Sequence, residues 1–161
     1  MLLDSPLAAW NKGNYRDAPG HSGESPKGIK MLDEGRKSLE GLKVMVIDDS
    51  KTIRRTAETL LKREGCEVVT ATDGFEALAK IADQQPQIIF VDIMMPRLDG
   101  HQTCALIKNN QLFKTTPVIM LSSKDGLFDK ARGRIVGSEQ YLTKPFTREE
   151  LLDAIRTHVH A

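Results

Sequence analysis

The sequence predicts an α/β fold in which a five-stranded parallel sheet is covered by helices on both faces. From residue 42 onward, short apolar runs alternate five times with segments whose apolar residues recur at helical spacing. The apolar runs lack polar alternation, which is typical of strands buried on both faces of a parallel sheet. Right-handed crossovers between such strands build a three-layer α/β/α sandwich, and we expect five helices and the strand order 2-1-3-4-5.

Each predicted strand leads into a helix with ordinary start or stop signals. The predicted strands cover 44–47, 68–69, 88–91, 118–121 and 141–142. The predicted helices cover 51–64, 75–82, 100–107, 127–136 and 147–158. Gly65 stops the first helix, the pairs 73–74 and 99–100 precede the second and third, and 147–150 form a capping box. Gly133 weakens the fourth helix by about 1 kcal/mol relative to Ala.

The composition excludes several functional classes. Across 161 residues, 23 Lys and Arg balance 22 Asp and Glu to a net charge of +1, which argues against a broad DNA-binding surface. No apolar run reaches the roughly 18–20 residues that cross a bilayer. Cys66 and Cys104 lie far apart and His101 is isolated, so neither a disulfide framework nor a zinc site is indicated. We therefore expect a protein of a reducing compartment, the cytoplasm, without membrane insertion.

Residues 1–40 differ in composition from the rest of the chain. Their Gly, Pro and Ser content, without a helical or strand period, indicates a flexible tail before one folded domain at 41–161. Met31 offers an alternative start, so residues 1–30 are a candidate for a misassigned start or a dispensable extension. Because the sequence ends soon after the last predicted helix, we expect no DNA-binding output domain.

Charged and polar residues stand at the carboxyl ends of the predicted strands. They are Asp48 and Asp49 after the first strand, Asp92 after the third, Ser122 after the fourth and Lys144 after the fifth. Open parallel sheets bind ligands at this edge, where the strand order reverses. With the first and third strands as neighbours, we expect three carboxylates to meet beside a hydroxyl and an ammonium. Each residue alone is typical of a cap or a surface position, but their joint placement indicates a site.

Three carboxylates in one pocket repel one another and favour a bound cation. Oxygen ligands of this kind suit Mg²⁺. Aspartate is also a known covalent acceptor of phosphoryl groups, and Mg²⁺, Lys144 and Ser122 would supply the positive charge and the donors that a phosphoryl group needs. The residues therefore predict phosphoryl transfer to Asp92 with Mg²⁺ as cofactor.

Four segments together resemble the signature motifs of the CheY-like receiver domain of bacterial response regulators. They are 46–50, 91–100, 120–123 and 144–146, which read VIDDS, VDIMMPRLDG, MLSS and KPF. The likeness extends over 42–158. It implies a flavodoxin/CheY-like fold and a phosphoacceptor signalling protein that is not an enzyme, since it catalyses only its own phosphorylation and dephosphorylation.

The resemblance assigns roles to the acidic residues. Asp92 matches the phosphoacceptor. Asp49, Asp92 and the backbone carbonyl of Met94 match the direct magnesium ligands. Asp48 matches an acid that binds magnesium through water.

Four further residues match the family pattern at the ends of the last two strands. Ser122 and Lys144 match the hydroxyl and the ammonium that reach the phosphoryl group. Tyr141 matches a ring whose rotamer follows the movement of Ser122, so these two residues are the expected switch. Pro145 matches a proline usually preceded by a cis peptide.

Two longer segments, 49–62 and 122–137, resemble the PilG-type regulators of type IV pilus twitching motility. The resemblance implies a phosphoryl donor in a chemotaxis-like histidine kinase or its histidine phosphotransfer domain. We expect a monomer or weak dimer whose target is a pilus-machinery or signalling protein and not DNA. The expected target-binding face consists of the fourth helix, the fifth strand and the fifth helix (127–136, 141–142 and 147–158).

Alternative functions fit parts of the pattern. A phosphorelay intermediate, which passes its phosphoryl group to another histidine domain, would use the same residues. A flavodoxin-type FMN carrier shares the strand order, but Asp48 and Asp49 would repel its phosphate. A haloacid-dehalogenase-type phosphatase would need a second acid where Met94 stands. Met94 also has no group that could orient a hydrolytic water, so we hypothesise a moderately long-lived phosphoryl group.

Overall fold

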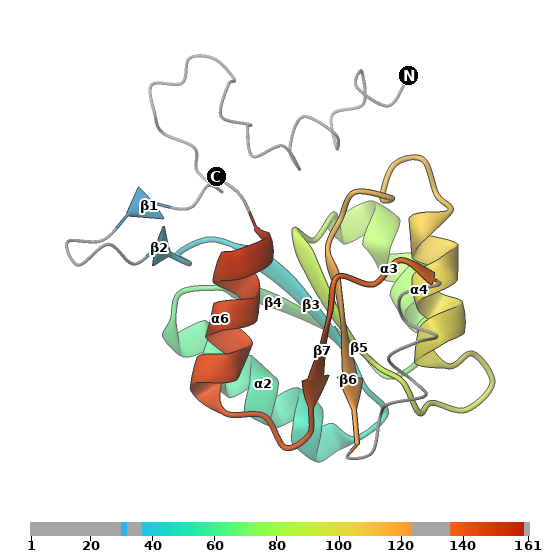
Figure 1. Ribbon diagram of the computed structural model, residues 1–161, viewed down its shortest axis with the longest axis horizontal. Coiled ribbons are helices and arrows are strands. Elements are labelled where there is room, and N and C mark those ends of the chain that lie inside the picture. Colours follow the sequence, from blue (N-terminus) through green and yellow to red (C-terminus); the bar gives the residue numbers. More distant parts are fainter. Residues whose placement is uncertain (1–29, 32–36, 124–135, 160–161) are drawn as a thin grey trace.

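A parallel sheet of five strands runs through the molecule in the order β4-β3-β5-β6-β7 (Figure 1). The computed structural model describes residues 30–31, 37–123 and 136–159. The strands are β3 (Lys43–Ile47), β4 (Glu67–Ala71), β5 (Ile88–Asp92), β6 (Val118–Ser122) and β7 (Gln140–Thr143). If only the five strands of this sheet are numbered, from β3 as the first to β7 as the fifth, the order is 2-1-3-4-5. The predicted order and the predicted α/β fold are therefore confirmed.

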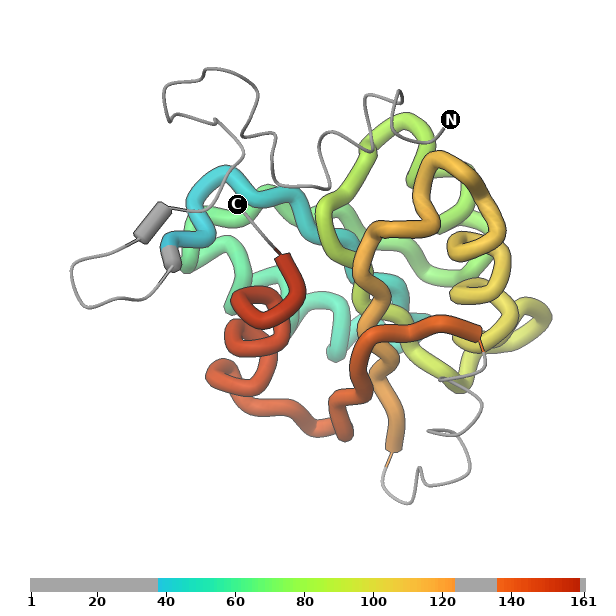
Figure 2. The backbone as a smooth tube through the Cα atoms, turned by 45° about the horizontal axis from the view of Figure 1, so that its top comes forward, coloured from blue at the N-terminus to red at the C-terminus, as the bar shows by residue number. Residues whose placement is uncertain are grey.

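Helices cover both faces of the sheet (Figures 1 and 2). Two of them, α2 (Lys51–Arg63) and α6 (Arg148–His158), pack on one face. The other two, α3 (Gly74–Gln84) and α4 (Gly100–Lys108), pack on the opposite face. These are the four helices of the described residues, and the predicted helix over 127–136 lies outside them apart from its last residue.

Alternate residues of the strands face opposite layers, so the sheet divides the core into two halves. In β3, Val44 and Val46 pack with α2 and α6, whereas Met45 and Ile47 pack with α3 and α4. Burial of each such side chain contributes about 1.5–3 kcal/mol to the free energy of folding. Because both faces are covered, the strands read as unbroken apolar runs in the sequence.

The helices begin at side chains that cap their free N–H groups. Ser50, Asp73, Asp99 and Thr147 each accept a hydrogen bond from the backbone N–H three residues further on. The predicted capping box at Thr147 is confirmed, and Asp99 forms another. Since α2 starts directly after Ser50, only three residues separate the end of β3 from the helix.

Leu39 is 2% exposed and lies in the core beside α2 and α6. The composition places this residue in the tail, but an apolar side chain next to the first strand is buried at little additional ordering cost. The Gly41 N–H donates to the Gly65 carbonyl at 2.8 Å, which joins this segment to the loop after α2. Further upstream, β1 (Lys30–Met31) pairs in antiparallel orientation with β2 (Lys37–Ser38).

Both cysteines are free and buried. Burial raises the pKa of the Cys66 thiol and of the Cys104 thiol to about 12. Both thiols therefore behave as small core side chains. Within the described parts of the chain, no helix has the length and apolar character needed to cross a membrane.

Candidate functional site

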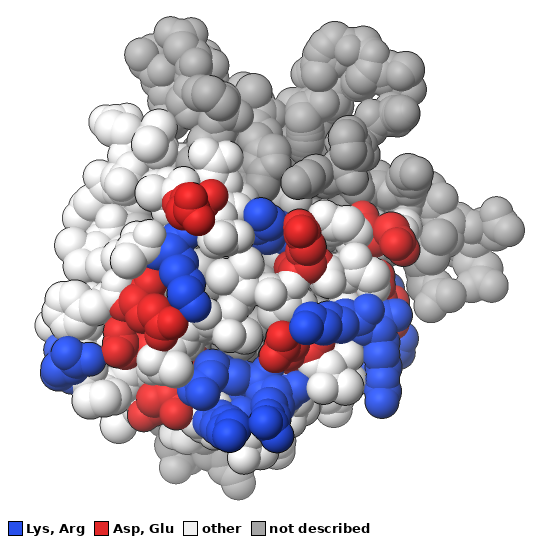
Figure 3. Space-filling view, turned by 180° about the vertical axis from the view of Figure 1, so that it is seen from behind, with Lys and Arg blue, Asp and Glu red and all other residues white. Residues whose placement is uncertain are grey.

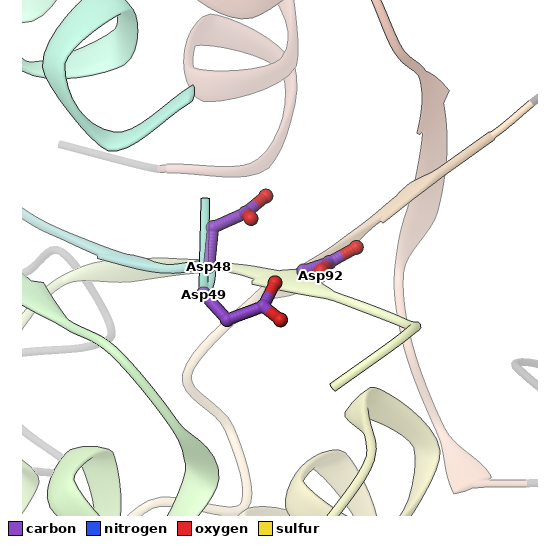
Figure 4. Close-up of side chains that lie close together, drawn as sticks. All are labelled: Asp48, Asp49 and Asp92. Carbon is purple, nitrogen blue, oxygen red and sulfur yellow. The ribbon is translucent and has the colours of Figure 1, made fainter. Parts of the chain in front are cut away.

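The carboxylates of Asp48, Asp49 and Asp92 gather at the carboxyl ends of two adjacent strands (Figure 4). β3 and β5 pair in parallel with Ile47 opposite Val91, so the next residues along the two strands, Asp48 and Asp92, are neighbours. One carboxylate oxygen of each aspartate lies within 4.8 Å of the others. Strand register therefore brings the adjacent pair Asp48 and Asp49 together with Asp92, which is more than 40 residues away in the sequence.

The turn between β3 and α2 holds Asp48 in place. Asp48 is fully buried, its Oδ1 accepts a hydrogen bond from the Ser50 N–H at 2.8 Å, and its carbonyl accepts one from Arg54 Nη1 at 2.7 Å. The Ser50 hydroxyl in turn accepts from the Ile53 N–H at 3.3 Å and caps α2. Asp49 is exposed and opens the acidic cluster to solvent.

Lys144 supplies positive charge to the two buried acids. Its Nζ lies 2.9 Å from Asp92 Oδ1 and 3.3 Å from Asp48 Oδ2. The Lys144 N–H donates to the Ser122 carbonyl at 2.7 Å, which fixes the backbone at the end of β7. The following peptide bond, Lys144–Pro145, is cis.

Burial decides the protonation behaviour of this cluster. It raises the pKa of Asp92 to about 6; the hydrogen bond from Lys144 opposes this rise, and the charge of Asp48 adds to it. Burial also raises the pKa of Asp48, although Ser50 and Lys144 donate hydrogen bonds to it. For Lys144, burial lowers the pKa, but the two carboxylates outweigh burial and the pKa is raised overall. The site thus has less positive charge than its ionised carboxylates need.

Ser122 lies at the end of the strand between Asp92 and Lys144. In the sheet, Leu121 stands opposite Asp92 and Ser122 stands opposite Thr143. The Ser122 residue is 3% exposed, and its hydroxyl donates to the Ser123 carbonyl at 3.0 Å.

The loop after β5 holds Asp92 by its backbone. The Met94 N–H donates to Asp92 Oδ1 at 3.4 Å, while the Met94 residue is 69% exposed. The Gly100 N–H donates to the Ile93 carbonyl at 2.9 Å. A Cβ on Gly100 would lie 2.4 Å from the Asp92 carbonyl oxygen, so glycine is required where α4 meets the end of β5.

Tyr141 lies against α4, and its partner there was missed by sequence reasoning. His101 Nε2 lies 3.1 Å from the Tyr141 hydroxyl, and His101 is 1% exposed. The interpretation of His101 as isolated concerned metal ligands, and it did not predict this contact with Tyr141. The strand register indicates the side of the sheet on which Tyr141 lies. Tyr141 stands opposite Met120, whose side chain packs in the half of the core formed with α3 and α4. The sequence of the helix alone does not show that α4 packs beside β7. The contact between His101 and Tyr141 could therefore not be inferred from it.

The donor set of the acidic cluster fits a divalent cation. Asp48, Asp49 and Asp92 offer oxygen only, which is the chemistry that Mg²⁺ prefers. Burial has raised the pKa of Asp48 and of Asp92, and a bound cation would favour their charged forms. These three residues would therefore hold the metal.

Comparison with known families and curated proteins gives concordant matches. A family model described as "Response regulator receiver domain" matches residues 44–156. Protein PilG of Pseudomonas aeruginosa is 82% identical over 120 residues, which cover 74% of this chain and 89% of PilG. The alkaline phosphatase synthesis transcriptional regulatory protein PhoP of Bacillus subtilis is 39% identical over 109 residues, which cover 68% of this chain and 45% of PhoP.

Solved structures give the same match for the fold. The chemotaxis protein CheY4 of Vibrio cholerae has a TM-score of 0.71 and 34% identity, covering 74% of this chain and 99% of that one. The receiver domain of a Francisella response regulator has a TM-score of 0.67 and 37% identity, covering 73% of this chain and 95% of that one.

Proposed function

This chain belongs to the response regulator receiver domain family, and on that basis we propose that Asp92 accepts a phosphoryl group from a phosphohistidine. In this transfer an Asp92 carboxylate oxygen attacks phosphorus and a P–O bond forms. The N–P bond to the donor histidine breaks, and the ring nitrogen leaves with the electron pair. Mg²⁺ held by Asp48, Asp49 and Asp92 would offset the negative charge on the phosphoryl oxygens.

The contact between Lys144 and Asp92 is the observation that best supports this proposal. Lys144 Nζ lies 2.9 Å from the accepting carboxylate, inside a cluster of three carboxylates. An ammonium in this position stays within reach of the phosphoryl oxygens after transfer and can pair with them. Ser122, from the strand between these residues, offers a hydroxyl to another phosphoryl oxygen once its side chain turns from the Ser123 carbonyl.

The charge distribution near the site favours an anionic donor. Figure 3 shows a group of Lys and Arg side chains in the lower part of the molecule, with Asp and Glu side chains beside it, toward the end at which β6 and β7 terminate in Figure 1. At this end α2 begins, with Lys51, Arg54 and Arg55 in its first two turns. Positive charge beside an acidic pocket attracts a phosphorylated partner that the pocket alone would repel.

The identity of 82% with PilG suggests the cellular role. The proposed donor is a histidine kinase of chemotaxis type or its phosphotransfer domain, and the proposed process is type IV pilus twitching motility, controlled from the cytoplasm. The output face includes β7 and α6, which lie next to Lys144 on either side. Phosphorylation there adds charge to a site whose switch residues, Ser122 and Tyr141, lie on adjacent strands.

Incubation of the full chain with Mg²⁺ and a small phosphodonor such as phosphoramidate tests the chemistry. We expect one phosphoryl group per chain by intact-mass measurement, and none in Asp92→Asn. The matched control is Asp83→Asn, an exposed aspartate of α3, which should be labelled like the wild type. Equal labelling of Asp92→Asn and the wild type would refute the assignment of Asp92.

A second experiment separates direct output from phosphorelay. The labelled chain is mixed with a histidine phosphotransfer domain that has not been phosphorylated. Retention of the phosphoryl group, together with phosphorylation-dependent capture of a pilus protein, supports direct output. Rapid transfer of the label to the histidine domain supports a relay instead.

A further inference from the structure

His101 and Tyr141 connect α4 to β7 through a part-buried polar contact. His101 Nε2 and the Tyr141 hydroxyl are 3.1 Å apart, and either tautomer allows a hydrogen bond because a phenol hydroxyl can donate or accept. His101 is 1% exposed, and the Tyr141 ring packs against the half of the core that α3 and α4 form. Because His101 is buried and Tyr141 is partly buried, losing this contact would leave a buried His101 nitrogen without this hydrogen bond, which is unfavourable.

His101 is also one residue away from a tight contact with the proposed phosphoacceptor. The preceding residue, Gly100, donates its N–H to the Ile93 carbonyl at 2.9 Å. Its hypothetical Cβ would meet the Asp92 carbonyl oxygen at 2.4 Å and Ile93 Cα at 2.7 Å. The start of α4 therefore has little freedom to move independently of the backbone that carries Asp92.

We propose that His101 is a positioning residue for Tyr141, whose hydrogen bond holds the phenol ring against α4. Two contacts in series then connect the end of β5 with the ring on β7: Gly100 on the Asp92 backbone and His101 on the Tyr141 hydroxyl. This route runs through α4 and differs from the expected one through Ser122.

The hydrogen bond biases the rotamer equilibrium of Tyr141. A neutral hydrogen bond shifts such an equilibrium by about three- to tenfold. If phosphorylation of Asp92 changes the rotamer of Tyr141, which rests on the proposed function, loss of His101 changes the size of that response, because the two effects act on one equilibrium.

A double-mutant cycle measures the contact without reference to phosphorylation. Urea unfolding of the full chain is compared for the wild type, His101→Leu, Tyr141→Phe and the double variant. We expect the unfolding equilibrium constant to show a coupling of about three- to tenfold. His101→Gln, which keeps a polar atom near the position of Nε2, should recover most of the coupling with Tyr141. Additive effects of His101→Leu and Tyr141→Phe would overturn the proposal.

A spectroscopic measurement distinguishes positioning from general stability. With tyrosine labelled at its ring carbons, the chain gives signals from Tyr15 and Tyr141, which Tyr141→Phe assigns. We expect His101→Leu to move the Tyr141 signal and His101→Gln to restore it. Leu106→Gln, an exposed position of α4 (47% exposed), is the control and should leave the signal unchanged. An unchanged Tyr141 signal in folded His101→Leu would refute positioning, whether or not Asp92 is phosphorylated.

Discussion

Lys144 Nζ lies 2.9 Å from Asp92 Oδ1, so a lysine at the end of β7 neutralises an acid at the end of β5. The same ammonium lies 3.3 Å from Asp48 Oδ2, and the Lys144 side chain is 21% exposed. One cation is thus shared by two buried carboxylates from neighbouring strands. The charge balance of both carboxylates therefore depends on this one ammonium.

Replacement of Lys144 by Met should destabilise the protein in the absence of Mg²⁺. It leaves the carboxylates of Asp48 and Asp92 without their ammonium, and removal of one partner from a buried ion pair costs about 3–5 kcal/mol. Because Lys144 is partly exposed, we expect about 2 kcal/mol at pH 7.5 by urea unfolding. Lys62→Met is the control, since that side chain is 58% exposed in its pair with Glu58 and should cost less than about 0.5 kcal/mol. Equal stability of Lys144→Met and the wild type would contradict this prediction.

Addition of Mg²⁺ should stabilise the wild type and not Asp49→Asn. A ligand that binds only the folded state raises the free energy of unfolding by about 2.7 kcal/mol at 100 times its Kd. Asp49 is the exposed member of the cluster, so its replacement removes a metal ligand without leaving a buried charge unpaired. Thermal unfolding with MgCl₂, at ionic strength matched with KCl, provides the measurement. Asp83→Asn should respond like the wild type, and a full Mg²⁺ response in Asp49→Asn would exclude Asp49 as a ligand.

Gly100→Ala should destabilise the chain more than Gly74→Ala. The new methyl at Gly100 meets backbone atoms of Asp92 and Ile93, which can move only by displacing β5. At Gly74 the nearest atoms belong to the side chains of Thr103 and Leu98 and not to the backbone, so they can shift without displacing a strand, at the cost of the hydrogen bond from Thr103 Oγ1 to the Asp99 carbonyl. We expect about 3 kcal/mol for Gly100→Ala and about 1 kcal/mol for Gly74→Ala by urea unfolding. The reverse order would show that α4 can move away from β5 without disturbing it.

The layered fold was predictable because strands and helices each leave a characteristic pattern of apolar residues in the sequence. Val44 to Ile47 are buried on both sides, so they form an unbroken apolar run, while α2 shows apolar residues at helical spacing. The acidic cluster was predictable for a related reason: parallel strands have their carboxyl ends at one edge, so Asp48 and Asp92 had to lie near each other once the order was right.

Contacts that depend on which way a side chain points were not predictable in the same way. Lys144 was expected beside the acids, but its sharing between Asp48 and Asp92 follows from distances that no spacing rule specifies. His101 received no role because its partner is 40 residues away and on another element. Leu39 was placed in the tail because average composition conceals a single buried residue.

Glu76 should make the free energy of unfolding decrease as the pH falls below about 4.5. Hydrogen bonds from the Thr72 backbone, and then from Lys80 and the Thr72 hydroxyl, lower the pKa of Glu76 from its ordinary 4.5 to about 2. A depressed pKa in the folded state gives stability that is present above about pH 4.5 and is lost as pH falls toward 2. The side chain is 36% exposed, so after allowance for solvent screening we expect about 1 kcal/mol.

The measurement for Glu76 is urea unfolding of the wild type and Glu76→Gln between pH 3 and 7. The difference between them should be constant near neutrality and shrink in acid. Glu58→Gln, which removes an exposed helical ion pair with Lys62, should show a smaller difference at neutral pH. A difference for Glu76→Gln that does not change with pH would contradict the lowered pKa.

Replacement of Met94 by Asn should shorten the lifetime of the phosphoryl group that we propose on Asp92. Met94 is 69% exposed beside Asp92, and its thioether is a poor partner for the water that hydrolyses an acyl phosphate. An amide there can orient that water, and one hydrogen bond of this kind accelerates loss by about three- to tenfold. Intact-mass measurement after removal of the phosphodonor, with Met94→Leu as the apolar control, gives the decay. We expect the wild type and Met94→Leu to retain the phosphoryl group for minutes and Met94→Asn to lose it sooner. Decay in the wild type within seconds would show that Met94 does not limit the access of water to the phosphoryl group.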